Sequence, residues 1–570
     1  MPEIRRAHNR GHPPPGRKVA ILLLGIWFAL ILTTSSSGPM LAGSNTLAMS
    51  LPETDPLTIR VGLLEDYEKL TFQFTGNYSI VTLAGDTIRT AAPSAVKWRA
   101  RVEESVPAQF LYSVLANSFS NNAKAMELAE QFEADGTPAV VRQVGGPIEV
   151  DGQVVGDNTL YRVQVGSFMT EAEAVKFAET LFDDYVPRIV REVLRPAKGT
   201  IELFDADLIE AYTLKDGFRL IPISENAKFT IFGIHTGSGF KYEPVEDRTY
   251  RGILEVYFDH TGLLAAVNEI PIDTYLKGVV PSEMPAGFPD QALAAQAILA
   301  RTVVLAEKSI KHLNDRYDVC AHVHCQVYSG ITQEDDRTTK AVNDTKGMVL
   351  VNGSRLVVAH YSAVCGGHTE ANDAAWLAPP SSAMRGHPCS CDESLQVPDL
   401  TTESGVRKWV TSTPDVCCNL SGLNLPVSAD YAKKHFRWEV SYSRQELEEI
   451  IKDKTGTDVG TLYDILPVQR GVSGRLMEIE ILGSRRNLRI KRELKIRRAL
   501  SKSALPSSCF VVDIVNDSDG MPVEIILTGA GYGHGVGLCQ CGAARQAANG
   551  KTYGEILQFY FPGTGVVKLY

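Results

Sequence analysis

One glutamate stands where its side chain could act as a proton donor. Glu283 lies between Pro281 and Pro285 and directly before Met284. The two prolines restrict the backbone, so the turn can hold the carboxyl group against apolar surface. Removal from water raises the pKa of a carboxyl group, as a general acid requires. The ordinary alternative is an exposed loop glutamate.

Arg301 stands at the end of a row of small residues. Ala294, Ala297 and Arg301 follow the i, i+3, i+7 spacing of one face in a predicted helix from Asp290 to Lys308. The guanidinium fork suits orienting a carboxylate or holding substrate oxygens. A surface arginine is the alternative.

Residues 320–325 contain four potential metal ligands: Cys320, His322, His324 and Cys325. Thiolate and imidazole groups suit zinc, usually as a tetrahedron of four ligands. In a strand, Cys320, His322 and His324 point to one side, and Cys325 needs a bend to join them. A disulfide is the alternative to zinc. The same choice stays open for Cys389, Cys391, Cys417 and Cys418 in the loop-rich segment 378–432.

Two further stretches place polar side chains beside glycines. His368 follows Gly366 and Gly367, His534 stands among glycines at alternate positions, and Gln540 comes after them. Glycines allow positive φ and let a ligand approach the backbone closely. His368, His534 and Gln540 are therefore candidate substrate contacts, although His368 also fits a loop histidine with local hydrogen bonds.

The segments around these residues predict a β-rich region with two helices. The helices are expected at Ile272–Val279, where Pro271 suits the first turn, and at Asp290–Lys308. Alternating apolar residues predict strands at Ile59–Leu64, Leu70–Phe74, Arg219–Ile223, Phe229–Ile234 and Ile253–Phe258.

An internal repeat interrupts this pattern. Leu111–Val144 aligns without gaps on Leu160–Val193, a shift of 49 residues. Each copy is predicted as strand, helix, strand, and Thr170 with Glu173 forms a capping box for the second helix. Two βαβ copies predict a sheet with helices on one face, which leaves the other face free to bind a ligand.

Composition narrows the possible functions and the cell compartment. The net charge of −10 argues against a general nucleic-acid binder. Basic residues precede an apolar run, Val19–Leu32, which is typical of a signal peptide or a membrane anchor. The chain is therefore expected outside the cytoplasm, where its ten cysteines could form disulfides.

The repeat resembles the SPOR family through YRVQVGSFMTEAEAVKFAETL and, less closely, LYSVLANSFSNNAKAMELAEQ. The resemblance covers residues 105–198. It implies binding to peptidoglycan glycan strands that lack stem peptides, and we take Tyr161, Gln164 and Phe168 as candidate glycan contacts.

The second half resembles the SpoIID/LytB family. The matching motifs are VNEIPIDTYLKGVVPSEMPAGFPDQALAAQAILART, CAHVHCQVYSG, AHYSAVCGGHTE followed by Trp376, and GYGHGVGLCQCGAARQAANGKTYGEILQFYFPGT. They stand in the family's order, whereas Cys539 and Cys541 replace its usual serine and tyrosine. The predicted fold class is α+β, with signal or anchor and linker at 1–50, first strands of the SpoIID-like domain at 57–100, an inserted SPOR-like module at 105–198 and the remaining SpoIID-like domain at 205–570.

This resemblance implies lytic cleavage of peptide-free glycan strands, with Glu283 as catalytic acid and base and Arg301 serving the active site. It also implies zinc at Cys320, His324 and Cys325, with His312 as a possible replacement for His322. The metal is expected to be structural. The LytB branch implies a rival role as a non-catalytic stimulator of a cell-wall amidase. A zinc-dependent hydrolase is the other rival.

Overall fold

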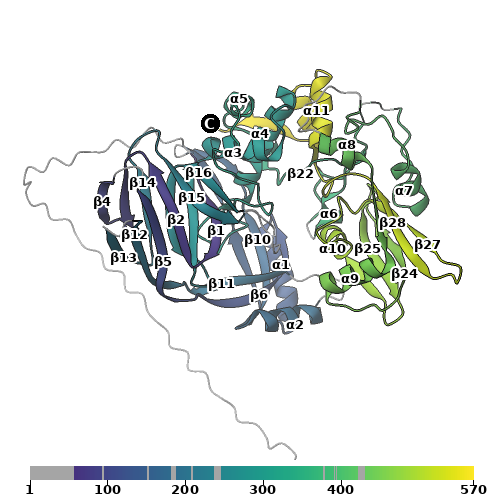
Figure 1. The fold of residues 1–570 in the computed structure, drawn as a ribbon, viewed down its shortest axis with the longest axis horizontal. Coiled ribbons are helices and arrows are strands. Elements are labelled where there is room, and N and C mark those ends of the chain that lie inside the picture. The colour runs from purple at the N-terminus through teal and green to yellow at the C-terminus, as the bar shows by residue number, and fades with distance from the viewer. Residues whose placement is uncertain are drawn as a thin grey trace, which may run out of the picture. The chain divides into compact units, whose positions relative to one another are not determined.

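The computed structural model describes residues 57–92, 96–150, 153–181, 188–206, 210–235, 245–376, 379–390, 392, 394–421 and 430–570. The predicted signal or anchor segment lies outside these residues. In the described ranges, every helix is too short or too polar to cross a membrane. The described chain is a strand-rich α+β structure (Figure 1).

Two sheets share the first hydrophobic core, and nearly all of their strand pairs are antiparallel. The seven-stranded sheet has the order β19 (Val319–Cys320), β1 (Thr58–Tyr67), β18 (Leu264–Pro271), β17 (Ile253–Phe258), β14 (Gly217–Pro222), β3 (Tyr78–Thr82) and β4 (Thr87–Ala92). The six-stranded sheet has the order β13 (Ala211–Lys215), β12 (Lys198–Asp205), β5 (Lys97–Val106), β2 (Lys69–Thr75), β15 (Lys228–His235) and β16 (Val245–Arg251). Ile80 and Leu254 of the first sheet and Phe72 and Trp98 of the second are buried in one cluster.

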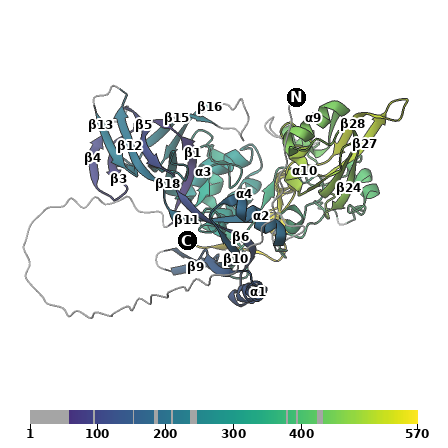
Figure 2. The ribbon, with the colours of Figure 1, turned by 90° about the horizontal axis from the view of Figure 1, so that it is seen from below.

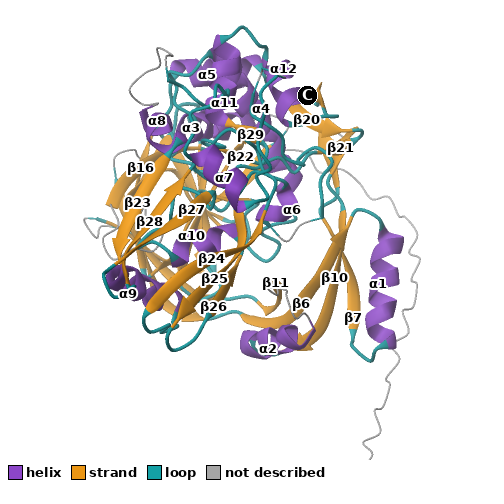
Figure 3. Ribbon diagram, turned by 90° about the vertical axis from the view of Figure 1, so that its right-hand side faces the viewer, coloured by secondary structure: helices purple, strands orange, loops and turns teal. Residues whose placement is uncertain are grey.

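The repeat forms a four-stranded sheet of its own. Its order is β11 (Arg188–Arg195), β6 (Gln109–Phe119), β10 (Leu160–Phe168) and β7 (Ala139–Val144). Ala129 of α1 (Asn122–Ala134) and Ala178 of α2 (Glu171–Leu181) pack with Val163 and Val165, so both helices cover one face (Figure 3). The hairpin β8 (Pro147–Val150) and β9 (Gln153–Asp157) joins the two copies. β5 before the repeat pairs with β12 after it.

Three helices come after β18 in the chain: α3 (Ile272–Glu283), α4 (Asp290–Glu307) and α5 (Asp336–Asp344). From Ala292 to Ala306, every residue of α4 is buried, because α3 and α5 pack on it. Aliphatic residues and alanines all around the helix fit this position, since a helix surrounded by protein has no polar face.

The remaining chain forms small sheets and short helices. The sheets are β21 (Arg355–Leu356), β20 (Met348–Asn352) and β30 (Gly565–Lys568); β22 (Tyr361–Ser362) and β29 (Leu538–Cys539); β23 (Trp438–Ser443), β28 (Pro522–Gly529) and β27 (Phe510–Asn516); and β24 (Leu462–Arg470), β25 (Leu476–Gly483) and β26 (Leu488–Lys491). The helices are α6 (Asn372–Ala375), α7 (Glu403–Val410), α8 (Asp430–Phe436), α9 (Arg444–Thr455), α10 (Glu493–Ala499), α11 (Gln540–Ala548) and α12 (Tyr553–Tyr560). α9 and α10 lie beside β24, β27 and β28 (Figure 2).

Candidate active site

Glu283 is the last residue of α3. The helix is longer than the predicted Ile272–Val279, because it continues through Pro281 before the backbone turns extended at Met284. Proline has no N–H to donate into the preceding turn, so the helix ends within one turn of it. The predicted turn around Glu283 is therefore a helix end, and Glu283 projects from it.

The carboxyl group of Glu283 lies in a desolvated environment with one backbone donor. The N–H of Val327 donates a hydrogen bond of 2.7 Å to Oε1. Burial raises the pKa of Glu283 to about 7, and the Val327 hydrogen bond offsets only part of this increase. The neutral acid is thus substantially populated near neutral pH, as general acid catalysis requires.

Tyrosine and glutamine side chains lie near the end of α3. Gln540 Nε2 donates 2.9 Å to the main-chain carbonyl of Glu283 and lies 3.3 Å from Gln296 Oε1. Gln326 Nε2 donates 3.2 Å to the hydroxyl of Tyr361. Burial first and the charge of Glu283 second raise the pKa of Tyr361 well above its usual value, so Tyr361 stays neutral beside the acid.

Arg301 lies in the predicted helix, but in the interior and not at the surface. Its side chain is fully buried, and Nε and Nη2 bind Asp273 Oδ1 at 2.8 and 2.5 Å. The guanidinium also donates to the carbonyls of Met348 and Val342. Asp273 lies ten residues before Glu283 on α3, a rise of about 15 Å. Arg301 therefore joins α3 to α4 in the interior and orients the carboxylate of Asp273, one of the two roles predicted for it, while contact with substrate oxygens gains no support from these contacts.

His534 belongs to an aromatic group. Its ring centroid lies 4.7 Å from that of Trp376, which in turn lies 4.3 Å from His360. Burial lowers the pKa of His534 well below its usual value, so the ring is neutral. Nδ1 accepts 3.0 Å from the Val536 N–H, which leaves the ring proton on Nε2. His360 directly precedes Tyr361, so the chain connects this group to the surroundings of Glu283.

His368 matches the local alternative. Its Nδ1 lies 2.7 Å from the carbonyl oxygen of Thr369, and burial lowers its pKa to about 4. The backbone there pairs with Pro388. None of its polar contacts within the described ranges reaches Glu283. His368 thus orders its own loop, and the substrate contact predicted for it gains no geometric support.

The predicted metal-binding segment folds as a turn. Only Val319–Cys320 is a strand, and the Cys325 N–H donates 3.0 Å to the His322 carbonyl, which bends the chain. The ligand atoms of His312, Cys320, His324 and Cys325 all lie within 4.8 Å of one another. His322 is exposed and outside the group. His312 therefore replaces His322, which corrects the strand-based set of ligands.

The donor set and its surroundings fit zinc. Two thiols and two imidazoles form a suitable tetrahedral set. His312 Nε2 lies 3.3 Å from Cys325 Sγ, while its Nδ1 lies 2.8 Å from Asp315 Oδ2. A carboxylate on the second ring nitrogen is the usual way to orient a metal-binding histidine.

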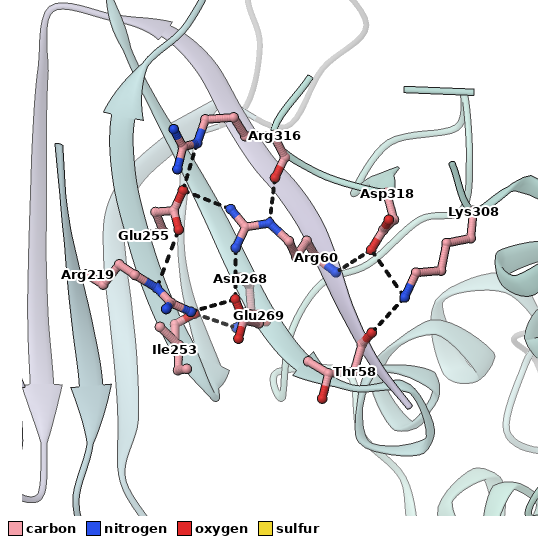
Figure 4. Close-up of polar contacts among 10 residues, drawn as sticks. All are labelled: Thr58, Arg60, Arg219, Ile253, Glu255, Asn268, Glu269, Lys308, Arg316 and Asp318. Atoms are coloured by element: carbon pink, nitrogen blue, oxygen red, sulfur yellow. Dashed lines mark hydrogen bonds and ion pairs between the residues drawn. The ribbon is translucent and has the colours of Figure 1, made fainter. Parts of the chain in front are cut away.

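An ion-pair network anchors the chain between His312 and Cys320 (Figure 4). Buried Glu255 lies 2.8 Å from Arg60 and 3.0 Å from Arg316. Arg60 also donates 2.6 Å to the Arg316 carbonyl and, through its backbone N–H, 3.0 Å to Asp318. Arg316 and Asp318, which lie between His312 and Cys320 in the chain, are therefore tied to β1 and β17.

The candidate glycan contacts divide between the two faces of the repeat sheet. Tyr161 packs with the core under the helices, and the Phe168 ring lies 5.0 Å from Phe177 of α2. Gly166, at φ +72°, interrupts the alternation of β10 and turns Phe168 toward the helices. Only Gln164 faces away from them. The packing of Tyr161 and Phe168 under the helices therefore gives no support to their predicted glycan contacts, whereas Gln164 remains a candidate.

The opposite face is partly covered by the segment after α4. Arg162 stands two residues before Gln164 on the same face of β10. It is buried and donates a hydrogen bond of 2.7 Å to the Ile310 carbonyl. Arg191 of β11 pairs with Asp315 at 3.3 Å. The repeat sheet thus contacts the same segment that supplies His312.

Sequence reasoning missed several residues around Glu283. Tyr361 and His360 stand in the motif AHYSAVCGGHTE, which drew attention only to its glycines and His368. Gln326 follows Cys325 directly. Gln296 stands in the alanine-rich helix, where a buried glutamine at 0% exposure is unusual and was a usable signal.

Comparison with known proteins agrees with both resemblances. Residues 260–352 match the family described as SpoIID, stage II sporulation protein, and residues 108–188 match the SPOR domain. Residues 391–537 match a domain of unknown function, DUF8618.

Three relatives show how far the likeness extends. An uncharacterized protein of Brachyspira hyodysenteriae is 28% identical over 335 residues, which cover 58% of this chain and 75% of the relative. The amidase enhancer of Bacillus subtilis is 27% identical over 320 residues, 51% of this chain and 40% of the relative. Stage II sporulation protein D of Bacillus subtilis is 24% identical over 315 residues, 53% of this chain and 76% of the relative. The chain therefore contains one segment that matches the SpoIID family and another that matches the SPOR domain, and its relatives include proteins named stage II sporulation protein D and amidase enhancer.

Proposed function

We propose that this protein is a peptidoglycan lytic transglycosylase that acts outside the cytoplasm on peptide-free glycan strands. The observation that carries the proposal is the carboxyl group of Glu283, held at a helix end with a pKa of about 7. One acid suffices when the sugar supplies its own nucleophile, whereas hydrolytic glycosidases generally need two carboxyl groups.

The reaction uses Glu283 twice. The neutral carboxyl group protonates the glycosidic oxygen as the bond from MurNAc C1 to GlcNAc breaks. The resulting carboxylate then removes the proton from the MurNAc C6 hydroxyl, whose oxygen attacks C1 to form the 1,6-anhydro ring. Glu283 returns to the neutral acid, so no water is consumed. Such acid–base help contributes roughly 10²–10⁴-fold.

Neighbouring residues hold the acid in place. Val327 fixes the carboxyl group and Gln540 fixes the helix end. We propose that neutral Tyr361 and His534 contact the sugar. Zinc would be held by the group of His312, Cys320, His324 and Cys325. The metal there would stabilise the turn that leads to Val327.

The SPOR module supplies binding to the glycan strand in this proposal. We infer that it is an insertion in the SpoIID-type domain, supported by the pairing of β5 with β12 on its two sides. Gln164 is the candidate contact on the face away from the helices.

Stimulation of a cell-wall amidase is the second candidate function, favoured by the similarity to a relative named amidase enhancer. It requires glycan binding but no proton donor. The two functions therefore differ in their dependence on Glu283.

The test incubates the purified chain with peptide-free glycan strands and measures anhydro-muramyl ends by mass spectrometry. Glu283→Gln should abolish these ends while glycan binding persists. Asp344→Asn, which changes an exposed carboxylate paired with exposed Lys340, is the control and should cleave normally. Unchanged cleavage by Glu283→Gln contradicts the proposal that Glu283 is the catalytic acid of a lytic transglycosylase. Absence of cleavage by the wild type, together with stimulation of an added amidase by both proteins, favours the second function.

A further inference from the structure

We propose that Cys365, Cys389, Cys418 and Cys539 form a second metal site, in which four thiolates hold one structural zinc ion. The four sulfurs all lie within 4.8 Å of one another, and the side chains are 0–2% exposed. The cysteines come from four separate stretches of chain, so only the fold brings them together. Glu283 and the proposed lytic activity do not depend on this inference.

The spacing of the sulfurs suits one ion. Cys365 Sγ lies 3.6 Å from Cys418 Sγ. A disulfide requires about 2.05 Å, whereas four sulfurs about 2.3 Å from a central zinc lie about 3.8 Å apart. An iron–sulfur cluster holds its cysteines farther apart, because several irons lie between them. The geometry therefore points to one tetrahedral ion rather than to a disulfide or a cluster.

Hydrogen-bond donors surround the sulfurs as they do in metal thiolate sites. Cys539 caps the N-terminus of α11, and its sulfur accepts from the N–H groups of Cys365 at 3.2 Å and Gly542 at 3.4 Å. The Tyr560 hydroxyl lies 3.2 Å from Cys389 Sγ. Donors of this kind stabilise thiolate over thiol and orient the ligands.

Close packing around the sulfurs leaves no room for a bulkier residue at position 542. A Cβ on Gly542 would lie 2.8 Å from Cys389 Sγ and closer still to the Tyr560 hydroxyl.

Arg437 donates 3.1 Å to the carbonyl of Gly366, next to Cys365. Its charge partly offsets the net negative charge of four thiolates and one Zn²⁺.

The position of the site explains what the metal does. Ser362 pairs with Cys539 in the two-stranded β22–β29 sheet, while Cys389 and Cys418 belong to stretches with little regular structure. The hydrophobic core there contains all four cysteines. A metal that joins them supplies folding energy to loops that lack a sheet or long helix of their own. It also fixes Cys539, directly before Gln540.

The experiment separates this site from the first cluster. Full-length Cys320→Ser/Cys325→Ser protein lacks two ligands of the first cluster. It should retain about one zinc per chain by elemental analysis, and its X-ray absorption should show four sulfur neighbours at about 2.3 Å. Cys418→Ser in the wild-type background should lose about one zinc per chain. Cys509→Ser, which changes a buried cysteine outside the group, should lose none.

Three results would overturn the proposal. The first is that the Cys320→Ser/Cys325→Ser protein remains folded but contains no zinc. The second is that peptide mass analysis finds a Cys365–Cys418 disulfide. The third is that the protein contains iron in place of zinc. The double variant leaves all four proposed ligands intact, so its metal content tests the site even if Cys418→Ser does not fold. Glycan cleavage is not a readout of any arm, so failure here is distinct from failure of the proposed function.

Discussion

The side-chain amide of Gln540 binds the main-chain carbonyl of Glu283, although 257 residues separate them. This bond joins the N-terminus of α11 to the end of α3. The last carbonyls of a helix lack partners within the helix, and Gln540 satisfies one of them. The acid is therefore positioned from both sides, since Val327 holds its carboxyl group and Gln540 its backbone.

Stability should depend on pH through Glu283. Its pKa is about 7 in the folded protein and 4.5 when exposed. The unfolded chain therefore releases this proton first, and the stabilisation present below pH 4.5 is lost as pH rises through 7. Glu283→Gln removes this loss of stability. The free energy of unfolding of the variant minus that of the wild type should therefore be about 3 kcal/mol larger at pH 8 than at pH 4.5. Denaturant unfolding at both pH values measures it, and an equal difference at both contradicts the raised pKa.

Cleavage should fall above neutral pH. The reaction begins with neutral Glu283, and the fraction in that form drops tenfold for each pH unit well above 7. We expect kcat/KM to decline with unit slope on a logarithmic plot above pH 7. Glycan binding, measured in parallel, should change little. A profile that stays flat to pH 9 is incompatible with Glu283 as the acid.

Substitution of Arg301 should reduce stability more than chemistry. Arg301→Met leaves Asp273 buried without its cation, a change that costs about 3–5 kcal/mol. Asp273→Asn/Arg301→Met removes both charges and should recover part of that cost. Denaturant unfolding gives the energies. Anhydro-muramyl ends measured at a temperature where each variant is folded should remain near wild type, and loss of cleavage without loss of stability restores a direct catalytic role.

Local patterns predicted the elements better than the contacts between them. The helix predicted at Asp290–Lys308 is α4 at Asp290–Glu307, and the capping box of Thr170 with Glu173 is present. These features depend on neighbouring residues. Alanine spacing placed Arg301 on a helix face, but nothing local showed that Asp273 would meet that face. The turn at Cys320–Cys325 could not be predicted, because a hydrogen bond that closes a turn leaves no periodic pattern in the sequence.

Metal content should distinguish His312 from His322. His312 lies in the first cluster and hydrogen-bonds to Asp315, whereas His322 is exposed outside it. His312→Ala should lower zinc affinity, and His322→Ala should leave it unchanged. Competition with a chelator, followed by elemental analysis, measures both variants in one background. Equal retention by the two proteins contradicts the ligand set, and loss only in His322→Ala restores the strand arrangement.

Glycan binding should depend on Gln164 more than on Tyr161. Gln164 points away from α1 and α2, while Tyr161 packs beneath them, so only the glutamine is placed to bind a sugar hydroxyl. Loss of one such hydrogen bond, about 0.5–1.5 kcal/mol, weakens binding roughly two- to twelvefold. Gln164→Ala should show this change in pull-down with peptide-free glycan strands. Tyr161→Phe keeps the packed ring and should bind as wild type does. The opposite ranking would place the glycan on the helix-covered face, contrary to the packing of β10.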